Sequence, residues 1–497
     1  MKLQRSVHLR EASLLVALLG VSLVLRGRLA YRTASVDEAL FLVNGWRWLS
    51  GQAFSDTTWL PGWYPLSFLP LGWAGWWGGI TLARGLSALF GILTVALVYW
   101  IGRRVHGPLA GYLAGFLMAV SGPAIAVQTL ATNTAASVFL FAVAVFLWIT
   151  GLLEDRGDHL VWGSAVAVLS ILMRFSAYYT TVTCFVFAVL AGLAGSTRLG
   201  GFRSGFVWVH VHKPRLRQVA LFALPFAFLP LFSWVYGANS SLSKFLGLKL
   251  EGIPAATPQA LFSDIAGYLW LPALLGLPAI LSARNRGISL GLAVVGLGAL
   301  PYHLLTRDST TLHQNVAYMT IGLAPLAGGG LASVARTLQR LSSERLALAL
   351  TLPLAAVAVL SFGWAGQQDL GPLRSYWSDV SAAMQHLQRN VAEGDVLLME
   401  GGQVAEYYLV EKGTPGRIPA RVWTTWHYQD EEGSGTEAFE RAVRDRRFDW
   451  IILDYNYTPE LDQQIFGLMS GRYELEGTFP ALLYGEFGRV EVFRALP

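Results

Sequence analysis

The segment ARGLSALFGILTVALVYWIGRRVHGPLAGYLAGFLMAVSG, residues 83–122, decides the fold class of this chain. It contains two apolar runs, which are separated by Arg103 and Arg104. A run of about 18 or more apolar residues is long enough to cross a bilayer as a helix. The segment therefore predicts two membrane spans, at about 80–101 and 108–128, joined by a short basic loop.

The composition extends this interpretation to most of the chain. Of the 497 residues, 54% are hydrophobic and only 14% are charged, whereas about a quarter of the residues in a soluble globular domain are charged. The eighteen tryptophans fit a membrane protein, since Trp favours the membrane–water interface. Cys184 is the only cysteine, which excludes an intrachain disulfide and a two-cysteine metal site.

The apolar runs predict a polytopic α-helical membrane protein with eleven spans. These lie at about 12–30, 80–101, 108–128, 133–152, 160–175, 177–194, 218–237, 262–283, 288–305, 316–335 and 346–364. No small-residue cleavage site follows the first run, so we interpret it as an uncleaved anchor.

The basic residues of the loops predict the orientation of the chain in the plasma membrane. They concentrate in alternate loops, at 103–104, 198–217, 284–286 and 336–345. The positive-inside rule then predicts a cytoplasmic N-terminus and an outer C-terminus. It explains the net charge of +5 better than a nucleic-acid partner does.

Two non-membrane segments are expected on the outer side: the Trp-rich loop 31–79 and the tail 370–497. We therefore divide the chain into a membrane domain, 1–369, and a C-terminal extracytoplasmic domain. In the tail, strand-like runs alternate with helical patterns, which predicts a small α/β domain. Strands are expected at 395–400, 449–455 and 489–493, and helices at 376–391, 402–412, 436–447 and 459–471.

An acidic pair, Asp37 and Glu38, begins a predicted helix in the first outer loop. Ser35, with Glu38 three residues later, matches the capping-box pattern. An apolar stripe along the helix predicts that it lies on the outer membrane surface; its members are Ala39, Leu42, Val43, Trp46 and Leu49. The cap accounts for Glu38. Asp37 lies away from the stripe, so both a functional role and interaction with the helix dipole stay open.

Two arginines lie at the membrane level. Arg84 begins the second span, and Arg174 lies between the fifth and sixth. A charge at that depth indicates function, with Asp37 or a lipid phosphate as the natural partner. Snorkelling of a long Arg side chain to the interface is an equal alternative.

The last outer loop, 301–318, is a second polar cluster. It contains His303, Arg307, Asp308, His313 and Tyr318. Each of these residues is also compatible with an ordinary solvated connection. The loop has no metal-ligand spacing such as HExxH. A divalent metal is compatible with these residues but not indicated, and no cofactor is expected.

The acidic pair after the first span is followed by WLPGWYPLSFLPLGW (59–73) and then by the segment at 83–122. This combination resembles the GT-C glycosyltransferases. It is most similar to their dolichyl-phosphate-mannose–protein mannosyltransferase-like and aminoarabinose-transferase-like members, of the glycosyltransferase family 39 type. The similarity covers residues 10–330, and the tail resembles α/β domains appended to such enzymes.

The resemblance implies an enzyme that moves a sugar from a polyprenyl-phosphate carrier to an acceptor hydroxyl on the outer face, with inversion. The acceptor would be a protein, a lipid or a polysaccharide. In that family the first acid of the pair is the general base, which maps onto Asp37, and Glu38 maps onto the supporting acid. Candidate phosphate or sugar ligands follow by position and are Arg84, Arg174, Arg307, His313 and Tyr318.

The family chemistry is consistent with these residue types. An inverting displacement requires one carboxylate to accept the proton of the acceptor hydroxyl. The leaving lipid phosphate requires a cation, and the planar guanidinium of Arg binds phosphate oxygens in bidentate fashion.

One departure from the family leaves a second interpretation open. Many relatives carry an acid in the outer loop after the third span, where this chain has AVQTLATNTAAS (126–137), with Asn133 near that position. The alternative is therefore a non-catalytic membrane subunit or pseudoenzyme whose tail binds a partner protein. A transporter is disfavoured, because the sequence lacks the paired repeats of transporters.

Overall fold

The computed structural model divides into two compact units. The helical unit comprises Met1–Leu29 and Ser87–Leu370, and the sheet unit comprises Ala30–Leu86 and Gly371–Pro497. The predicted boundary between residues 369 and 370 stays a prediction. The structure describes residues 2–27, 33–52, 65–174, 223, 257–282, 286–307, 309, 311–341, 343–375, 379–411, 421–424, 428–430, 433–434, 436–455, 459–483 and 486–497.

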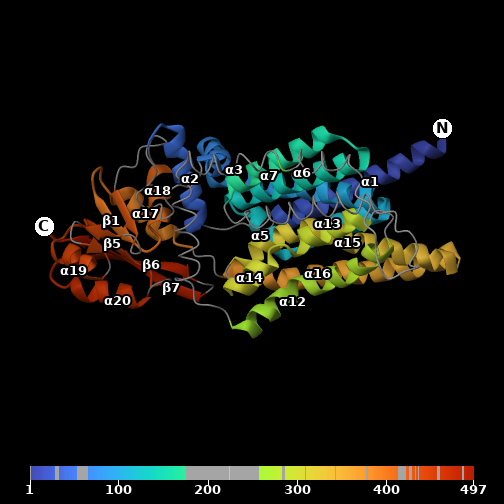
Figure 1. Cartoon of the computed structure of the whole chain (residues 1–497). Coiled ribbons are helices and arrows are strands. Elements are labelled where there is room, and N and C mark those ends of the chain that lie inside the picture. The colour runs from blue at the N-terminus through green and yellow to red at the C-terminus, as the bar shows by residue number, and fades with distance from the viewer. Residues whose placement is uncertain are drawn as a thin grey trace. The chain divides into compact units, whose positions relative to one another are not determined.

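Within the described residues, the helical unit consists of apolar helices, most of them long (Figure 1). They are α1 (Lys2–Gly27), α3 (Leu69–His106) from Ser87 onward, α4 (Pro108–Val120), α5 (Gly122–Thr129), α6 (Asn133–Glu154), α7 (Gly157–Met173), α12 (Pro258–Ser282), α13 (Arg286–Leu297), α14 (Leu300–Thr306), α15 (Leu312–Leu341) and α16 (Glu344–Ser375) as far as Leu370.

Within the described residues, six helical segments are long and apolar enough to cross a membrane. They are Leu69–His106, Asn133–Glu154, Pro258–Leu281, Arg286–Thr306, Leu312–Leu341 and Ala349–Gln368. The chain is therefore a multi-pass membrane protein, as its sequence predicts. The expected span at 177–194 lies outside the described residues, and so does that at 218–237 apart from residue 223. The total of eleven and the orientation therefore stay predictions.

The predicted span at 108–128 is broken. Helices α4 and α5 meet at Ser121 with a bend of 61°. Pro123 explains the break, because proline lacks the N–H that a continuous helix requires and its ring clashes with the preceding turn. The expected span at 160–175 corresponds to α7, which is a shorter apolar helix of 17 residues.

Helix α15 is at the centre of the helical unit and packs against α4, α12 and α13. Its glycines allow this close packing, since small residues let helix backbones approach each other. A Cβ atom on Gly330 would lie 1.7 Å from the carbonyl oxygen of Leu275 on α12. One on Gly322 would lie 2.4 Å from the carbonyl oxygen of Leu292 on α13.

The sheet unit contains α2 (Val36–Leu49), the short 3-10 helix η1 (Pro65–Ser67) and the first part of α3. The tail adds α17 (Ser381–Asn390), β1 (Val396–Met399), α18 (Gly402–Glu411), β2 (Arg421–Thr424), β3 (Gln429–Asp430), β4 (Gly433–Ser434), α19 (Thr436–Arg444), β5 (Trp450–Leu453), α20 (Pro459–Leu468), β6 (Tyr473–Leu483) and β7 (Glu486–Ala495).

Five strands form one sheet in the order β2-β1-β5-β7-β6. The pairs β1–β2 and β1–β5 are parallel, whereas β7 pairs antiparallel with both β5 and β6. Every residue of β5 is buried, which is typical of a parallel strand covered on both faces. The predicted C-terminal α/β domain is confirmed, with the three expected strands at β1, β5 and β7 and the four expected helices at α17–α20.

The sequence pattern missed β2, β3, β4 and β6. Strand β6 contains Gly477 and Pro480, which are unfavourable inside a strand. Strand β6 is nevertheless held along its length by β7, and its register shifts between Leu475 and Gly477.

The packing of α15 against α12 predicts unequal effects of two Gly→Ala substitutions. Gly330→Ala places a methyl group against the α12 backbone, and overpacking of this kind destabilises by ~1–3 kcal/mol. Gly267→Ala on α12 is the matched control, because a Cβ there meets nothing within 4 Å. Thermal unfolding of the purified protein in detergent should show a lower midpoint for G330A than for G267A, and equal midpoints would contradict this packing.

Candidate active site

The first turn of α2 carries the acidic pair, and the predicted capping box is present. The backbone N–H of Glu38 donates to Ser35 Oγ at 3.1 Å, and the backbone N–H of Ser35 donates to Glu38 Oε2 at 3.0 Å. Both bonds satisfy amide groups that a helix start leaves without an intrahelical partner. The start of α2 is thereby fixed.

Glu38 is fully buried and forms an ion pair with Arg84 of α3. Arg84 Nε donates to Glu38 Oε1 at 2.8 Å, and Arg84 Nη2 donates to Glu38 Oε2 at 2.8 Å. The same Nη2 also donates to the carbonyl oxygen of Thr33 at 2.9 Å. The guanidinium of Arg84 therefore holds Glu38 in a bidentate pair. The expected partners of Arg84, Asp37 or a lipid phosphate, stay predictions.

Asp37 differs from its neighbour in environment. It occupies the same first helical turn, yet its side chain is exposed, whereas that of Glu38 is fully buried. Both oxygens of Glu38 are engaged by Arg84, and one also accepts the capping bond. An exposed carboxylate can approach an external hydroxyl, which a general base has to do. The geometry therefore separates the two acids into one accessible and one structural carboxylate.

The expectation that the apolar stripe of α2 lies on the membrane is wrong for four of its five residues. Ala39, Leu42, Val43 and Trp46 are buried in the protein, whereas Leu49 is exposed. Trp46 stacks on Tyr407 of α18 at 5.4 Å between ring centroids. A Cβ atom on Gly45 would lie 2.5 Å from the Cα of Gly72, so the α2 and α3 backbones are in contact. This glycine pair makes protein packing possible where the stripe alone indicates a lipid contact.

Helix α18 holds α2 at both ends. Tyr408 Oη accepts a hydrogen bond from the backbone N–H of Ala34 at 3.1 Å, just before the cap. Near the other end, Arg47 pairs with the buried Glu406 at 2.6 Å. The tail therefore contributes directly to the position of the acidic pair, which sequence reasoning did not predict.

Helix α3 is interrupted by Gly78 and Gly79, whose dihedral angles are not helical. Gly79 has φ +61°, a conformation that L-amino acids other than glycine rarely adopt. Directly after the break, the backbone N–H of Ile80 donates to Tyr407 Oη at 3.1 Å. The break lies between the segment of α3 that packs on α2 and the turn that carries Arg84.

Arg174 lies in the helical unit, where it caps α7. Its Nη1 donates to Asn133 Oδ1 at 3.3 Å and to Thr134 Oγ1, and its Nη2 donates to Gln314 Oε1. The buried Asn133 also donates from Nδ2 to the carbonyl oxygen of Met173 at 2.6 Å. Arg174 thus joins α6, α7 and α15, and Gln314 is a contact that sequence reasoning missed.

The remaining candidates lie on or near α14 and α15. Tyr318 is buried and donates to Ser137 Oγ at 2.7 Å, so it connects α15 to α6. His313 is half-buried, and Arg307 is exposed at the end of α14 with φ +54°. Buried His303 shares a hydrogen bond with Asn315 at 2.9 Å. Asp308 lies outside the described residues.

The site geometry predicts unequal losses of stability for substitutions of the two neighbouring acids. Glu38→Gln removes one charge of a buried pair and should destabilise by about 3–5 kcal/mol, whereas Asp37→Asn at an exposed position should lower the unfolding midpoint by less. The double variant E38Q/R84Q should lose less stability than the sum of the losses in E38Q and R84Q, because no uncompensated buried charge remains. The measurement is thermal unfolding in detergent, and equal losses for E38Q and D37N would contradict this assignment.

The sequence matches one family model over part of its length. Residues 79–201 match the family model of dolichyl-phosphate-mannose-protein mannosyltransferases. No curated protein matches the sequence. The family match begins at the break in α3 and includes the segment that decides the fold class.

Several solved structures share the fold over nearly the whole chain. The archaeal oligosaccharyltransferase AglB from Archaeoglobus fulgidus, in complex with an inhibitory peptide and a dolichol-phosphate, is 12% identical with a TM-score of 0.56, over 96% of this chain and 74% of its own. ArnT from Cupriavidus metallidurans bound to undecaprenyl phosphate is 12% identical with a TM-score of 0.60, over 98% of both chains.

A third structure, the arabinofuranosyltransferase AftD from Mycobacteria, is 15% identical with a TM-score of 0.53, over 97% of this chain and 41% of its own. At these identities the structural likeness shows the fold. Together with the family match, it confirms the predicted resemblance to the GT-C glycosyltransferases.

Proposed function

We propose that this chain is a membrane glycosyltransferase that moves a sugar from a polyprenyl-phosphate carrier to an acceptor hydroxyl, with Asp37 as the general base. One observation carries the proposal: the Glu38–Arg84 pair and the capping box fix the first turn of α2, and Asp37 on that turn is exposed. The family match at residues 79–201 supports the reaction class. AglB and ArnT, whose structures contain polyprenyl phosphates, support the class of donor.

The reaction is a single inverting displacement. Asp37 accepts the proton of the acceptor hydroxyl while the hydroxyl oxygen attacks the anomeric carbon of the donor sugar. The bond between that carbon and the phosphate oxygen breaks, and the lipid phosphate leaves with the electron pair. The products are the glycosylated acceptor with inverted configuration, the lipid phosphate and protonated Asp37.

Glu38 has a positioning role in this mechanism. Its two oxygens accept hydrogen bonds from Arg84 and from the Ser35 backbone, so it supports the turn that presents Asp37. Arg84, expected as a phosphate ligand, has the same supporting role in our proposal. A bidentate guanidinium–carboxylate pair fixes orientation as well as distance.

The lipid phosphate requires cationic stabilisation as negative charge develops on the leaving oxygen. Arg174, Arg307, His313 and Tyr318 stay the candidates for phosphate or sugar contacts, by the resemblance and by their place in the sequence. Arg307 is exposed at the end of α14, which suits a side chain that meets a substrate. A donor with one phosphate does not require a divalent metal for this step.

The proposed setting is the outer face of the plasma membrane. The loop charges favour a cytoplasmic N-terminus, eleven spans and an outer tail, and a polyprenyl carrier requires a site at the bilayer. The acceptor class, whether protein, lipid or polysaccharide, is a matter for experiment.

A non-catalytic subunit or pseudoenzyme whose tail binds a partner is the second candidate. Asn133 favours it, because many relatives carry an acid near that position while this amide is committed to bonds with Arg174 and with the Met173 carbonyl. Co-purification of the chain with one stoichiometric membrane protein, without transfer activity, would support this alternative.

The activity test compares two carboxylate-to-amide variants. Asp37→Asn should lower transfer from polyprenyl-phosphate sugars by about 10²–10⁴-fold, the usual contribution of a general base. Asp445→Asn in an exposed turn of the tail is the matched control and should keep the wild-type rate. Radiolabelled undecaprenyl-phosphate mannose, galactose and aminoarabinose, reconstituted with native membranes as the acceptor source, provide the assay. Wild-type activity in D37N would reject the proposed base.

A further inference from the structure

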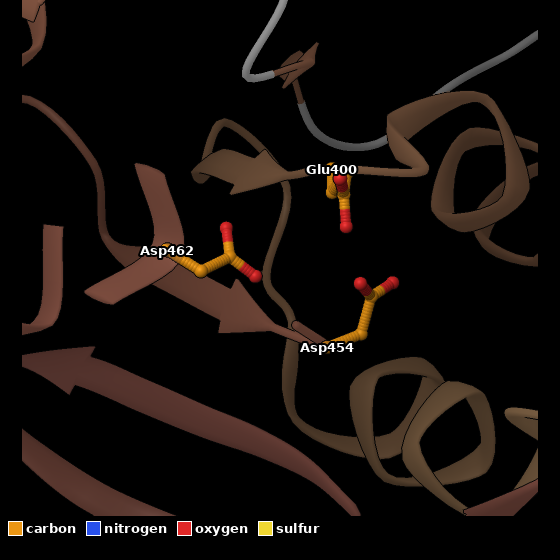
Figure 2. Close-up of side chains that lie close together, drawn as sticks. All are labelled: Glu400, Asp454 and Asp462. Atoms are coloured by element: carbon orange, nitrogen blue, oxygen red, sulfur yellow. The ribbon is translucent and has the colours of Figure 1, made fainter. Parts of the chain in front are cut away.

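Three buried carboxylates meet in the tail. Glu400 follows β1 directly, Asp454 follows β5 directly, and Asp462 lies in the first turn of α20. Figure 2 shows their carboxyl groups directed toward one another. One oxygen from each lies within 4.8 Å of the other two, and the exposed fractions are 2%, 4% and 0% for Glu400, Asp454 and Asp462.

One oxygen of Asp462 gives a second, independent observation at this cluster. Its Oδ2 accepts a hydrogen bond from the backbone N–H of Tyr455 at 2.8 Å, which fixes the side chain. Its Oδ1 is buried without a hydrogen-bond partner within the described chain. A carboxylate oxygen buried in this way is unfavourable, because it loses its water and gains nothing in exchange.

The electrostatics of the three carboxylates also favour a bound cation. Burial and, to a smaller extent, the nearby charge of Glu400 raise the pKa of Asp462 to about 7. Like charges at this distance oppose one another's ionisation. A bound cation removes both penalties, because it supplies positive charge and a ligand bond to each oxygen.

The chemistry of the three groups selects the class of ion. Carboxylate oxygens are hard ligands, and the cluster contains neither His nor Cys, which disfavours Zn²⁺ and Cu²⁺ and favours Mg²⁺ and Ca²⁺. Metal–oxygen bonds to these two ions measure about 2.0–2.6 Å. Ligand oxygens on opposite sides of one ion are therefore about 4–5 Å apart, which agrees with the 4.8 Å limit of the cluster.

We propose that Glu400, Asp454 and Asp462 bind one divalent cation of the Mg²⁺ or Ca²⁺ type. The ion holds the carboxyl ends of the adjacent parallel strands β1 and β5 to the start of α20. Binding at this site does not depend on the proposed transferase activity, and the ion takes no part in the displacement at Asp37.

The site is coupled to α2 through the residues that follow Glu400. A Cβ atom on Gly401 would lie 3.7 Å from Val36 Cγ2, at the first residue of α2. Helix α18 begins at Gly402 and carries Glu406 and Tyr408, which hold Arg47 and the Ala34 backbone. An ion at Glu400 therefore fixes the junction from which α18 supports the helix of Asp37.

The binding test uses the full-length protein in detergent, stripped of metal with EDTA. Isothermal titration with CaCl₂ and separately with MgCl₂ should show one site per chain for at least one of the two ions. The same ion should raise the thermal unfolding midpoint, because a ligand that binds only the folded state stabilises it. Absence of both binding and stabilisation in the wild-type protein would overturn the proposal.

Substitutions of the carboxylates test whether these three side chains are the ligands of the ion. Asp462→Asn should weaken ion binding at least tenfold without lowering the midpoint of the metal-free protein, because it removes a buried charge. Glu400→Gln serves as a second variant should D462N fail to fold, and Asp445→Asn serves as the exposed control with unchanged affinity. Equal affinity in D462N, E400Q and the wild-type protein would mean that the ion binds elsewhere, and it would overturn the proposal.

The coupling to α2 has its own measurement. Amide hydrogen exchange of the peptide that covers residues 36–49 should slow when the ion binds to the wild-type protein. The same ion should have no effect on that peptide in D462N. Ion binding without any change at 36–49 would keep the metal site and reject the coupling.

Discussion

The ion pair between Glu38 and Arg84 is the constraint on which the candidate site depends. It joins the first turn of α2 to α3, and it does so where Glu38 is fully buried. Removal of one partner from such a pair is far more unfavourable than removal of both, so each residue requires the other. Because of this pair, the two adjacent carboxylates have different environments: Glu38 is buried and supports the structure, whereas Asp37 is exposed.

The tail completes this arrangement in the sheet unit. Helix α18 supplies two tyrosines and a glutamate that contact the segment before α2, the break in α3 and the end of α2. The sheet that carries α18 is built around β1 and β5, whose buried apolar side chains form its centre. The position of the turn that carries Asp37 therefore depends on α18, and the position of α18 depends on the buried sheet.

The sequence was sufficient for features that depend on local pattern. Apolar runs predicted the membrane class, the capping box predicted the start of α2, and three strands of the tail were found from hydrophobicity. Local pattern failed where distant segments meet. The partner of Arg84 lies 46 positions away, and the burial of α2 depends on a contact between Gly45 and Gly72.

Other misses have the same physical origin. The three carboxylates at 400, 454 and 462 share no spacing motif, because strand pairing and a helix start bring them together. Strand β6 contains Gly and Pro that disfavour a strand, yet β7 holds it through tertiary pairing. The roles of Arg174, Arg307, His313 and Tyr318 stay predictions, since their positions in the fold are compatible with packing as well as with substrate contact.

The amide of Asn133 has a consequence for how this chain can change over evolutionary time. Its nitrogen donates to the Met173 carbonyl and its oxygen accepts from Arg174, a combination that one amide provides and a carboxylate does not. An aspartate at position 133 would place a carboxylate oxygen next to the carbonyl oxygen of Met173, and both of these buried atoms are acceptors. An aspartate at this position would therefore be unfavourable beside the Met173 carbonyl unless its surroundings changed as well.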